Sequence, residues 1–422
     1  MNDRKRPLRV LYSFPHQLGR SGIGTTAWHQ VAGLVEAGQD VTVCCGTCDR
    51  PLPGVPNDES LGPRPVKVIE TMRLAGVRVP YRAIGVERAW KVHDWQVARL
   101  LRSRAGEFDV VHTWPSGALM TLRAAREVGV KTFLERPNTH TGYAYEIVRR
   151  ECERLGLTQV HGACHTSNPR RLRLEEEEFQ TADRLLCPSD FVARTFIERG
   201  YPPGQIARHR YGCDLARFTA SGAREAERGG LRVAFVGTCE PRKGLHLALR
   251  AWVDSPASRD GAFSICGRFV PGYRELLASL LAHPSVRELG FQADVAAVMA
   301  DADVLMLPTL EEGSALVTYE ARACGCVLLV SEAAGALAED GVNALVHPVG
   351  DVATLGGQMT MLAGDRALLN RLRERSLAER QTLTWSAAAS ELVARYWECL
   401  KPVTPTRSAV NDREGVLIGA AT

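Results

Sequence analysis

The stretch that decides the fold occurs twice, as Pro7-Leu-Arg-Val-Leu-Tyr-Ser-Phe14 near the start of the chain and as Gly230-Leu-Arg-Val-Ala-Phe-Val-Gly237 near its middle. Both stretches are apolar runs without alternation, which is typical of strands buried on both faces of a parallel sheet. Each is followed by a polar, glycine-containing loop and an expected helix, over residues 25–37 in the first half and 244–253 in the second. The sequence therefore predicts two similar α/β units.

Further short apolar runs alternate with helical stretches in both halves. We expect strands at 41–45, 110–112 and 131–134 in the first half, and at 263–266, 286–289, 304–307, 327–330 and 344–346 in the second. This repetition of strand and helix indicates an α/β protein with two doubly wound, Rossmann-like domains. A chain of 422 residues is also too long for one compact core.

The predicted division gives a first domain over residues 1–210 and a second over 211–384. A helix is expected over 385–402, because Trp385, Leu392, Tyr396 and their neighbours form an amphipathic stripe. The remaining residues, 403–422, are polar and contain proline, so we expect a poorly ordered tail.

Charge is distributed unevenly along the chain. Residues 1–210 carry 31 Lys/Arg against 23 Asp/Glu, whereas the remainder carries 21 against 25. The basic first half indicates an anionic partner, a membrane surface or a solvated arginine-rich face. The amphipathic stretch 82–104, with Trp90 and Trp95, is expected to pack on the core, with peripheral membrane contact as the alternative. Nucleic acid is not an expected partner.

The location of the protein is expected to be the cytoplasm, with attachment to the inner membrane face left open. No apolar run approaches the roughly 20 residues that span a bilayer, and the start of the chain does not have the pattern of a signal peptide. Twelve cysteines in such a chain are expected to be reduced thiols. Their spacing fits no standard metal site, so no metal is expected.

The most specific chemistry lies in Glu312-Gly-Ser-Ala-Leu-Val-Thr-Tyr-Glu320, after the expected strand 304–307. We expect a helix from about Gly313 to Gly325. Its first N–H groups have no partner within the helix and its dipole is positive there, so this end favours an anion. Glu320 lies about two turns beyond Glu312, on nearly the same face but deeper. The arrangement suits a nucleoside diphosphate sugar, which is anionic in the middle and rich in hydroxyl groups at both ends.

Two cations, Arg242 and Lys243, lie in the loop after the apolar run 230–237. Ligands of open α/β sheets bind at this edge. An arginine can clamp a diphosphate with two hydrogen bonds, while a lysine supplies a compact charge. Phosphate binding is therefore favoured over a merely solvated pair.

The first half contains the pattern GxGxxA at Gly22, Gly24 and Ala27. After a strand, this pattern suggests a dinucleotide site with Asp49 as the ribose acid. Residues 15–20, however, separate it from the strand, so a long flexible loop in a cleft wall fits better, with a plain helix-start loop as the alternative.

Two histidines, His112 and His140, follow the expected strands 110–112 and 131–134. Both strand ends face the expected cleft. Each histidine is a candidate active-site group, and a structural role is equally open for each.

In the order of these features, the chain resembles the retaining glycosyltransferases of family four, which have the GT-B fold. The resemblance extends from about Leu8 to Leu400 and is most specific in the second half. The residues that carry it there are Gly237, Arg242-Lys243-Gly244, Gly267, Gly290, Asp303, Pro308, Glu312, Glu320, Ala323-Cys-Gly325, Gly335, Asp340-Gly341, Pro348 and Asp351. It implies two domains facing across a cleft, with the last helix crossing back to the first domain.

The resemblance also implies roles for single residues. Arg242 and Lys243 would hold the donor diphosphate and stabilise the departing nucleotide. Glu312 would contact the transferred sugar and Glu320 the ribose, with His140 as the active-site histidine. The other donor-site candidates are His112 as the substitute for His140, Gly22, Gly24, Asn138, Gly237, Gly290, Phe291, Gly313, Ser314, Ala315, and the backbone amides of Leu316 and Val317.

The implied reaction moves a hexosyl group from a UDP- or GDP-sugar with retention of configuration, without a cofactor or a divalent metal. The acceptor, a glycan, a lipid-linked molecule or a small molecule, would bind to the first domain. The chain has Ser314-Ala315 where the family commonly has Phe-Gly, which leaves the donor sugar open. The alternatives are a nucleotide-sugar epimerase of GT-B fold, an inactive sugar-nucleotide-binding protein and, more distantly, a dinucleotide oxidoreductase.

Overall fold

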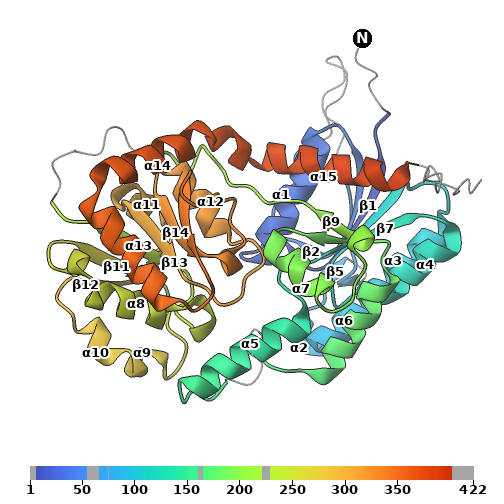
Figure 1. The fold of residues 1–422 in the computed structure, drawn as a ribbon. Helices are drawn as coiled ribbons and strands as arrows, with labels where there is room; N and C mark the ends of the chain where they lie inside the picture. Colours follow the sequence, from blue (N-terminus) through green and yellow to red (C-terminus); the bar gives the residue numbers. More distant parts are fainter. Residues whose placement is uncertain (1–5, 55–65, 75, 160–164, 221–228, 402–422) are drawn as a thin grey trace, which may run out of the picture.

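Two parallel sheets, one in each half of the chain, organise the computed structural model (Figure 1). The structure describes residues 6–54, 66–74, 76–159, 165–220 and 229–401. The predicted tail, 403–422, lies outside the described residues. Neighbouring strands in both large sheets run parallel, which confirms the doubly wound α/β class.

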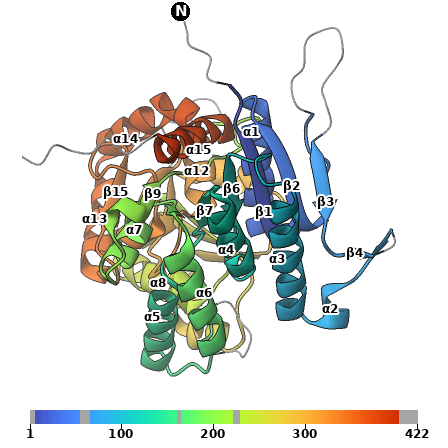
Figure 2. The same ribbon diagram turned by 90° about the vertical axis from the view of Figure 1, so that its right-hand side faces the viewer.

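The first sheet has the strand order β3-β2-β1-β6-β7-β8-β9. Its strands are β1 (Arg9–Leu18), β2 (Asp40–Cys48), β3 (Lys67–Glu70), β6 (Val110–Thr113), β7 (Lys131–Glu135), β8 (Arg184–Cys187) and β9 (Ile206–Arg208). Side chains of β1 alternate between two apolar clusters. Val10 and Tyr12 pack with helix α1 (Ile23–Glu36), whereas Leu11 packs with α3 (Val86–Ser103) and α4 (Leu119–Val128) on the opposite face. Figure 2 shows these helices on the two sides of the sheet.

The second sheet has the order β12-β11-β10-β13-β14-β15. Its strands are β10 (Arg232–Val236), β11 (Ala262–Cys266), β12 (Val286–Gly290), β13 (Val304–Leu307), β14 (Val327–Ser331) and β15 (Ala344–His347). One apolar cluster joins them to helices such as α8 (Leu245–Asp254) and α13 (Val352–Gly364), where Trp252 and Leu362 are fully buried. The other helices used below are α5 (Thr141–Arg154), α6 (Pro169–Thr181), α7 (Asp190–Ile197), α12 (Leu316–Ala323) and α15 (Trp385–Leu400).

Strand β1 is longer than the sequence predicted. It continues past Phe14 to Leu18, where it pairs with Cys48, after a register shift between Phe14 and Gln17. Pro15 cannot donate to the ladder, and such an irregularity is where a sheet accommodates a proline. The predicted long flexible loop is therefore wrong, because only residues 19–22 separate β1 from α1.

The predicted basic helix 82–104 is broken into α2 (Tyr81–Ile84) and α3 at Gly85, whose φ is 83°. A positive φ is readily adopted by glycine and ends the first piece. Ala89, His93, Val97 and Leu101 are fully buried, which confirms core packing for these residues, whereas Val86 and Trp95 are exposed.

The last helix, α15, begins at Trp385 as predicted and ends at Leu400, two residues before the predicted end. It crosses from the second lobe, built on β10–β15, onto the first lobe, built on β1–β9 (Figure 1). Its Leu392 and Tyr396 belong to the apolar core of the first lobe. At the crossing, Cys213 N–H donates to Leu383 O at 2.7 Å. The segment at Cys213 and the segment at Leu383, which both connect the lobes, therefore lie side by side.

Candidate active site

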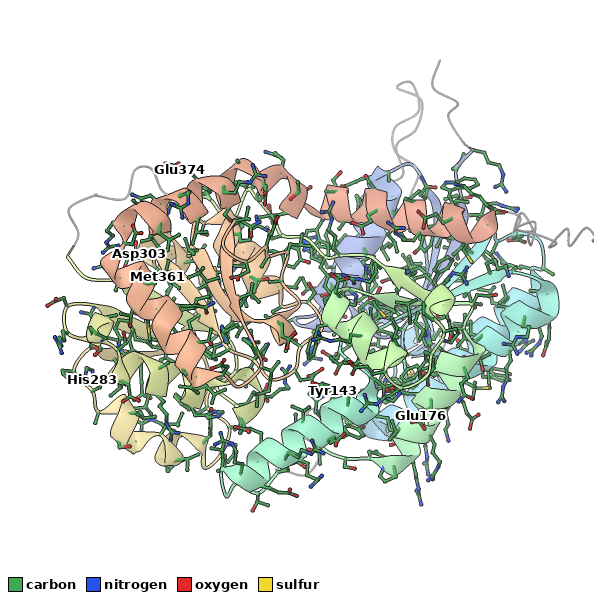
Figure 3. All side chains as sticks on the ribbon, in the orientation of Figure 1. Tyr143, Glu176, His283, Asp303, Met361 and Glu374 are labelled. Atoms are coloured by element: carbon green, nitrogen blue, oxygen red, sulfur yellow. The ribbon has the colours of Figure 1, made fainter. Side chains whose placement is uncertain are left out.

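The loops after β7 and β13 meet between the two lobes. A Cβ atom built on Gly313 would lie 1.7 Å from the Pro137 carbonyl oxygen and 3.2 Å from the Cα of Asn138. Ser189 Oγ, also in the first lobe, donates to the Gly313 carbonyl at 2.6 Å. Only a residue without a side chain permits this approach, which explains the glycine physically. Figure 3 shows side chains of both lobes along this boundary, with Tyr143 of α5 at its lower side.

Arg242 and Lys243 converge on the same carboxylates. Arg242 follows β10 in a short turn, and its Nη1 donates to Glu311 O at 2.8 Å and lies 3.2 Å from Glu312 Oε2. Its Nε donates to Glu240 Oε1 at 3.0 Å. Lys243 Nζ also pairs with the Glu312 carboxylate. The structure thus brings Arg242, Lys243 and Glu312 into one ion-paired group at the carboxyl edge of the second sheet.

Glu311 belongs to this group, although it is not among the residues predicted from the sequence. It is fully buried, and its Oε1 accepts from Thr139 Oγ1 at 2.6 Å and from the Thr139 N–H at 3.1 Å. Its Oε2 lies 3.3 Å from Arg242 Nη1. Burial acts to raise the pKa of Glu311, but His165, Arg242 and the Thr139 hydrogen bonds hold it below the ordinary value. The sequence feature that could have identified Glu311 as a site residue was the doublet Glu311-Glu312 after a buried strand.

Helix α12 begins at Leu316, three residues later than predicted. Ser314 Oγ donates to Gly335 O at 2.9 Å and lies 2.8 Å from Tyr319 Oη, while Ala315 N–H donates to Ala334 O at 3.1 Å. These bonds hold residues 313–315 outside the helix. They also turn the Ser314 hydroxyl towards Gly335 and Tyr319, and its place in the donor site stays a prediction. Leu316 and Val317, both half-buried, form the first turn of α12, where N–H groups lack partners within the helix.

Glu320 is half-buried in the middle of α12, and among the described residues its carboxylate has no recorded hydrogen bond or ion pair. Burial raises its pKa to about 7, against the opposing charge of Arg217. A carboxylate withdrawn from water without a protein partner favours a ligand that supplies hydroxyl groups.

Within the described residues, neither His112 nor His140 has a hydrogen bond or ion pair with Glu312 or Lys243, so the site role of each histidine stays a prediction. The His140 ring packs against Phe179, Phe196 and Tyr201, and its Nδ1 accepts from Gly142 N–H, which caps α5. The side chain therefore points into the first lobe. Burial lowers the pKa of His140 to about 3.

His112 is fully buried beneath α15. Its Nδ1 lies 2.6 Å from Tyr396 Oη, and its Nε2 lies 3.4 Å from Glu135 Oε2. Glu135 has further polar partners: it accepts a hydrogen bond from Gln30 at 2.8 Å and lies 2.9 Å from His209 Nε2. His112 thus connects the last helix to the first sheet rather than lining a cleft.

The glycine candidates lie at element ends. Gly22 precedes α1 with a φ of 85°, and open space surrounds the position that its Cβ would take. Gly24 is buried against Gln17 O, and Gly237 follows β10 with a φ of 147°. Gly290 ends β12. Phe291, next to it, is 63% exposed, and Arg268 Cζ lies 4.5 Å above its ring.

Two family models match successive parts of the chain. The family model described as "Glycosyl transferase 4-like domain" matches residues 21–212, and that described as "Glycosyl transferases group 1" matches residues 230–365. The D-inositol 3-phosphate glycosyltransferase of Streptomyces bingchenggensis is 26% identical over 350 residues, covering 77% of this chain and 72% of that protein. The enzyme of the same name from Mycobacterium bovis is 29% identical over 337 residues, covering 74% and 64%.

Solved structures resemble the whole chain. Anabaena HepE in complex with UDP has a TM-score of 0.63 at 15% identity, covering 93% of this chain and 100% of that one. The sucrose-phosphate synthase of Thermosynechococcus elongatus has a TM-score of 0.64 at 18% identity, covering 93% and 99%. Identities this low show the fold alone.

Two Rossmann-like lobes and both family models define one class of protein. The chain belongs to the group 1, family-four-like glycosyltransferases of GT-B fold. It is therefore a transferase enzyme. Within the described residues, no helix is long and apolar enough to cross a membrane.

Proposed function

We propose that this glycosyltransferase moves a hexosyl group from a UDP- or GDP-sugar to an acceptor bound by the first lobe, with retention and without a divalent metal. The observation that carries the proposal is the convergence of Arg242 and Lys243 on Glu312, just before the first turn of α12. Two cations and a helix N-terminus suit a diphosphate, and the adjacent carboxylate suits sugar hydroxyl groups.

In this proposal, the diphosphate takes the place of Glu312 beside the two cations, and Glu312 turns to the hydroxyl groups of the sugar. The half-buried carboxylate of Glu320 accepts hydrogen bonds from the ribose. The exposed ring of Phe291 offers a surface on which the base can stack. The UDP held by Anabaena HepE, a protein of the same fold, supports a nucleotide donor.

The bond between the anomeric carbon and the donor phosphate oxygen breaks, and its electron pair stays on the phosphate. An acceptor hydroxyl attacks from the same face and gives its proton to that phosphate. Arg242 and Lys243 stabilise the negative charge that develops, which is the role a metal ion fills in other transferases.

A thermal-shift panel of uridine, guanosine and adenosine diphosphates and their sugars tests the donor site. A ligand at 100 times its dissociation constant adds about 2.7 kcal/mol to the free energy of unfolding, which a melting curve resolves. We expect a shift with one base only, undiminished by EDTA. The absence of a shift with every nucleotide would overturn the proposal.

Product analysis separates the remaining alternatives. Retention predicts an α-linked product from an α-linked donor, which proton NMR of the anomeric position reads directly. An epimerised nucleotide sugar without transfer would identify an epimerase instead. Binding without any turnover across a broad acceptor panel would identify a sugar-nucleotide-binding protein.

A further inference from the structure

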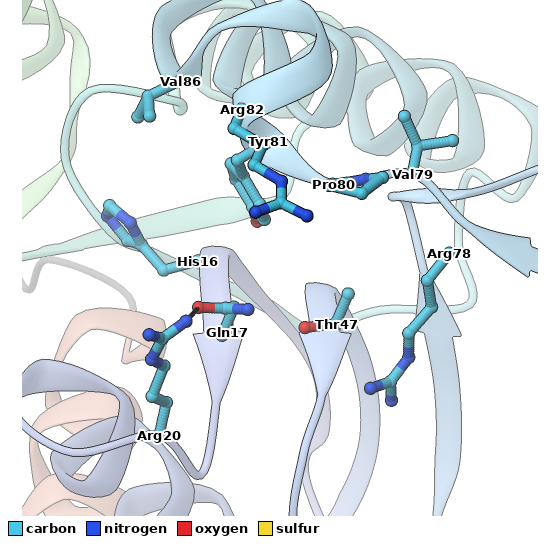
Figure 4. Close-up of a pocket in the computed structure, with 10 residues that line it drawn as sticks. All are labelled: His16, Gln17, Arg20, Thr47, Arg78, Val79, Pro80, Tyr81, Arg82 and Val86. Carbon is cyan, nitrogen blue, oxygen red and sulfur yellow. Dashed lines mark hydrogen bonds between the residues drawn. The ribbon is translucent and has the colours of Figure 1, made fainter.

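A cavity of about 610 Å³ opens at the carboxyl ends of β1 and β2, in the first lobe (Figure 4). Its floor comes from the ends of these strands and its wall from the segment that leads into α3. The lining residues are His16, Gln17, Arg20, Thr47, Arg78, Val79, Pro80, Tyr81, Arg82 and Val86.

The charge of this cavity has one sign. Among the described residues that line it, three are arginines and none is acidic. Figure 4 shows Arg20, Arg78 and Arg82 on different sides of the opening. Burial lowers the pKa of His16 to about 4, so this ring is neutral near pH 7 and adds hydrogen-bonding capacity without charge.

The three arginines differ in how they are held. Arg78 is anchored, since its guanidinium pairs with Glu70 at 2.7 Å and with Asp49 at 3.1 Å. Arg20 is bonded to Gln17, another lining residue. Arg82 is exposed and has no recorded hydrogen bond or ion pair within the described part of the chain. Its charge is therefore available to a ligand.

The wall is fixed against the sheet by Tyr81. Its hydroxyl donates to Pro15 O at 2.7 Å, at the irregularity in β1. A Cβ atom built on Gly46 would lie 1.7 Å from the same hydroxyl, so glycine at this position makes room for the contact. The cavity is consequently a built feature of the lobe, and Arg78 and Arg82 flank the anchor.

We propose that this cavity binds the acceptor substrate and that the acceptor carries a phosphate or carboxylate group. The proposal rests on the glycosyl-transfer function and names the chemical class of its second substrate. Gln17 and Arg20 line the cavity, and Gly22, a donor-site candidate, follows two residues later. Guanidinium groups are well suited to bind oxyanions with paired hydrogen bonds. When the arginines hold the anionic group, the rest of the acceptor lies adjacent to the loop of residues 19–22, which contains Gly22.

The test measures binding of inorganic phosphate and of glucose 6-phosphate, each against glucose, by calorimetry at low salt. We expect the phosphorylated sugar to bind at least about 10-fold more tightly than glucose, the scale of one charged hydrogen bond. Arg82→Ala and Arg20→Ala should remove this difference. Arg88→Ala is the matched control, because Arg88 on α3 is also exposed but is not among the residues that line the cavity.

Equal affinity for glucose and its phosphate, or equal losses in Arg82→Ala and Arg88→Ala, would overturn the proposal. Nucleotide affinity, measured in the same variants, should stay unchanged. A loss of nucleotide binding would therefore count against the proposed donor site and not against the acceptor cavity. Vesicles of phosphatidylglycerol distinguish the sources of the anion. If vesicles compete with glucose 6-phosphate and the Arg82→Ala substitution abolishes this competition, the acceptor is lipid-borne. If vesicle binding is unchanged by glucose 6-phosphate and by the Arg82→Ala substitution, the cavity is not the site.

Discussion

Thr139 of the first lobe gives both its hydroxyl and its backbone N–H to one oxygen of Glu311 in the second lobe, at 2.6 Å and 3.1 Å. The other oxygen of Glu311 lies 3.3 Å from Arg242. A single buried carboxylate therefore joins the loop after β7 to a residue proposed to hold the donor phosphates. The relative position of the lobes and the orientation of Arg242 depend on the same group.

Thr139→Val removes the hydroxyl from this connection and keeps the backbone N–H. A hydrogen bond to a charged group contributes about 1.5–3 kcal/mol, so we expect turnover to fall by roughly 10-fold or more while the nucleotide still binds. Steady-state kinetics and nucleotide titration measure the two effects. Thr139→Ser, which restores the hydroxyl, should recover the rate, and equal rates for Thr139→Val and the unmodified enzyme would contradict the coupling.

Lys243→Ala should lower turnover at least about 100-fold, the scale of losing a preorganised electrostatic contact in the transition state. The structure gives the reason, since Lys243 and Arg242 share the Glu312 carboxylate and so act at one place. Lys91→Ala on α3 is a suitable control, because that lysine is exposed and far along the chain from the site. Near-normal transfer by Lys243→Ala would contradict the assignment of Lys243 to the active site.

Glu320 links activity to pH and stability. Its pKa of about 7 in the folded protein exceeds the ordinary value of 4.5. Between these values the folded state keeps a proton that the unfolded chain has lost, so this group's contribution to the free energy of unfolding falls as pH rises through the window and stays low above about 7. Glu320→Gln should therefore melt higher than the unmodified enzyme near pH 8, with the difference shrinking towards pH 5.

The same substitution should weaken nucleotide binding, because an amide accepts fewer hydrogen bonds from a ribose than a carboxylate does. Glu320→Ala should lower turnover at least about 100-fold. Melting curves across the pH range, with and without nucleotide, check the stability and the binding of Glu320→Gln, and steady-state kinetics check the turnover of Glu320→Ala. A stability difference that does not change with pH would refute the burial of an ionisable group here.

His112→Ala and His140→Ala should both act on stability rather than on chemistry. His112→Ala leaves the Tyr396 hydroxyl and Glu135 with fewer partners, at a cost of about 1–3 kcal/mol for each buried group left unsatisfied. Urea unfolding measures this loss, and turnover well below the melting temperature should stay within about 10-fold. A 100-fold loss of turnover in folded His140→Ala would return that histidine to the active site.

Gly313→Ala should separate the two lobes locally, because the new methyl group would meet the Pro137 carbonyl, a backbone atom that cannot rotate away. We expect lower turnover together with faster proteolysis between the lobes. Gly204→Ala is the control, since open space surrounds that position. Equal behaviour of the two variants would contradict the contact across the boundary.

The fold was largely readable from the sequence, because strands buried on both faces leave long apolar runs. Strands β8 and β9 were not predicted, since they have only four and three residues and each includes an arginine. The extension of β1 was missed because Pro15 normally ends a strand, and the register shift that tolerates it depends on the partner strand.

The sequence predicted which residues form the candidate site better than it predicted the direction in which their side chains point. Arg242, Lys243 and Glu312 come together as the motif order indicated. Which way a side chain turns depends on neighbours far along the chain, such as Phe196 for His140 and Gly335 for Ser314. The sequence could not separate Glu311 from Glu312, although in the described part of the chain Glu311 bonds to Thr139 of the opposite lobe while Glu312 pairs with Arg242 and Lys243.

Helix α15 gives the first lobe an unusual order of assembly. Leu392 and Tyr396 complete a core whose other buried members lie between Leu8 and Ala207, and Gly33 lies so close to Ala389 that a Cβ there would be 2.7 Å away. During synthesis at roughly 5–20 residues per second, the first lobe must wait on the order of 10–40 seconds for these residues. Its apolar surface stays open on the ribosome for that time, so this lobe is where a chaperone would bind the nascent chain.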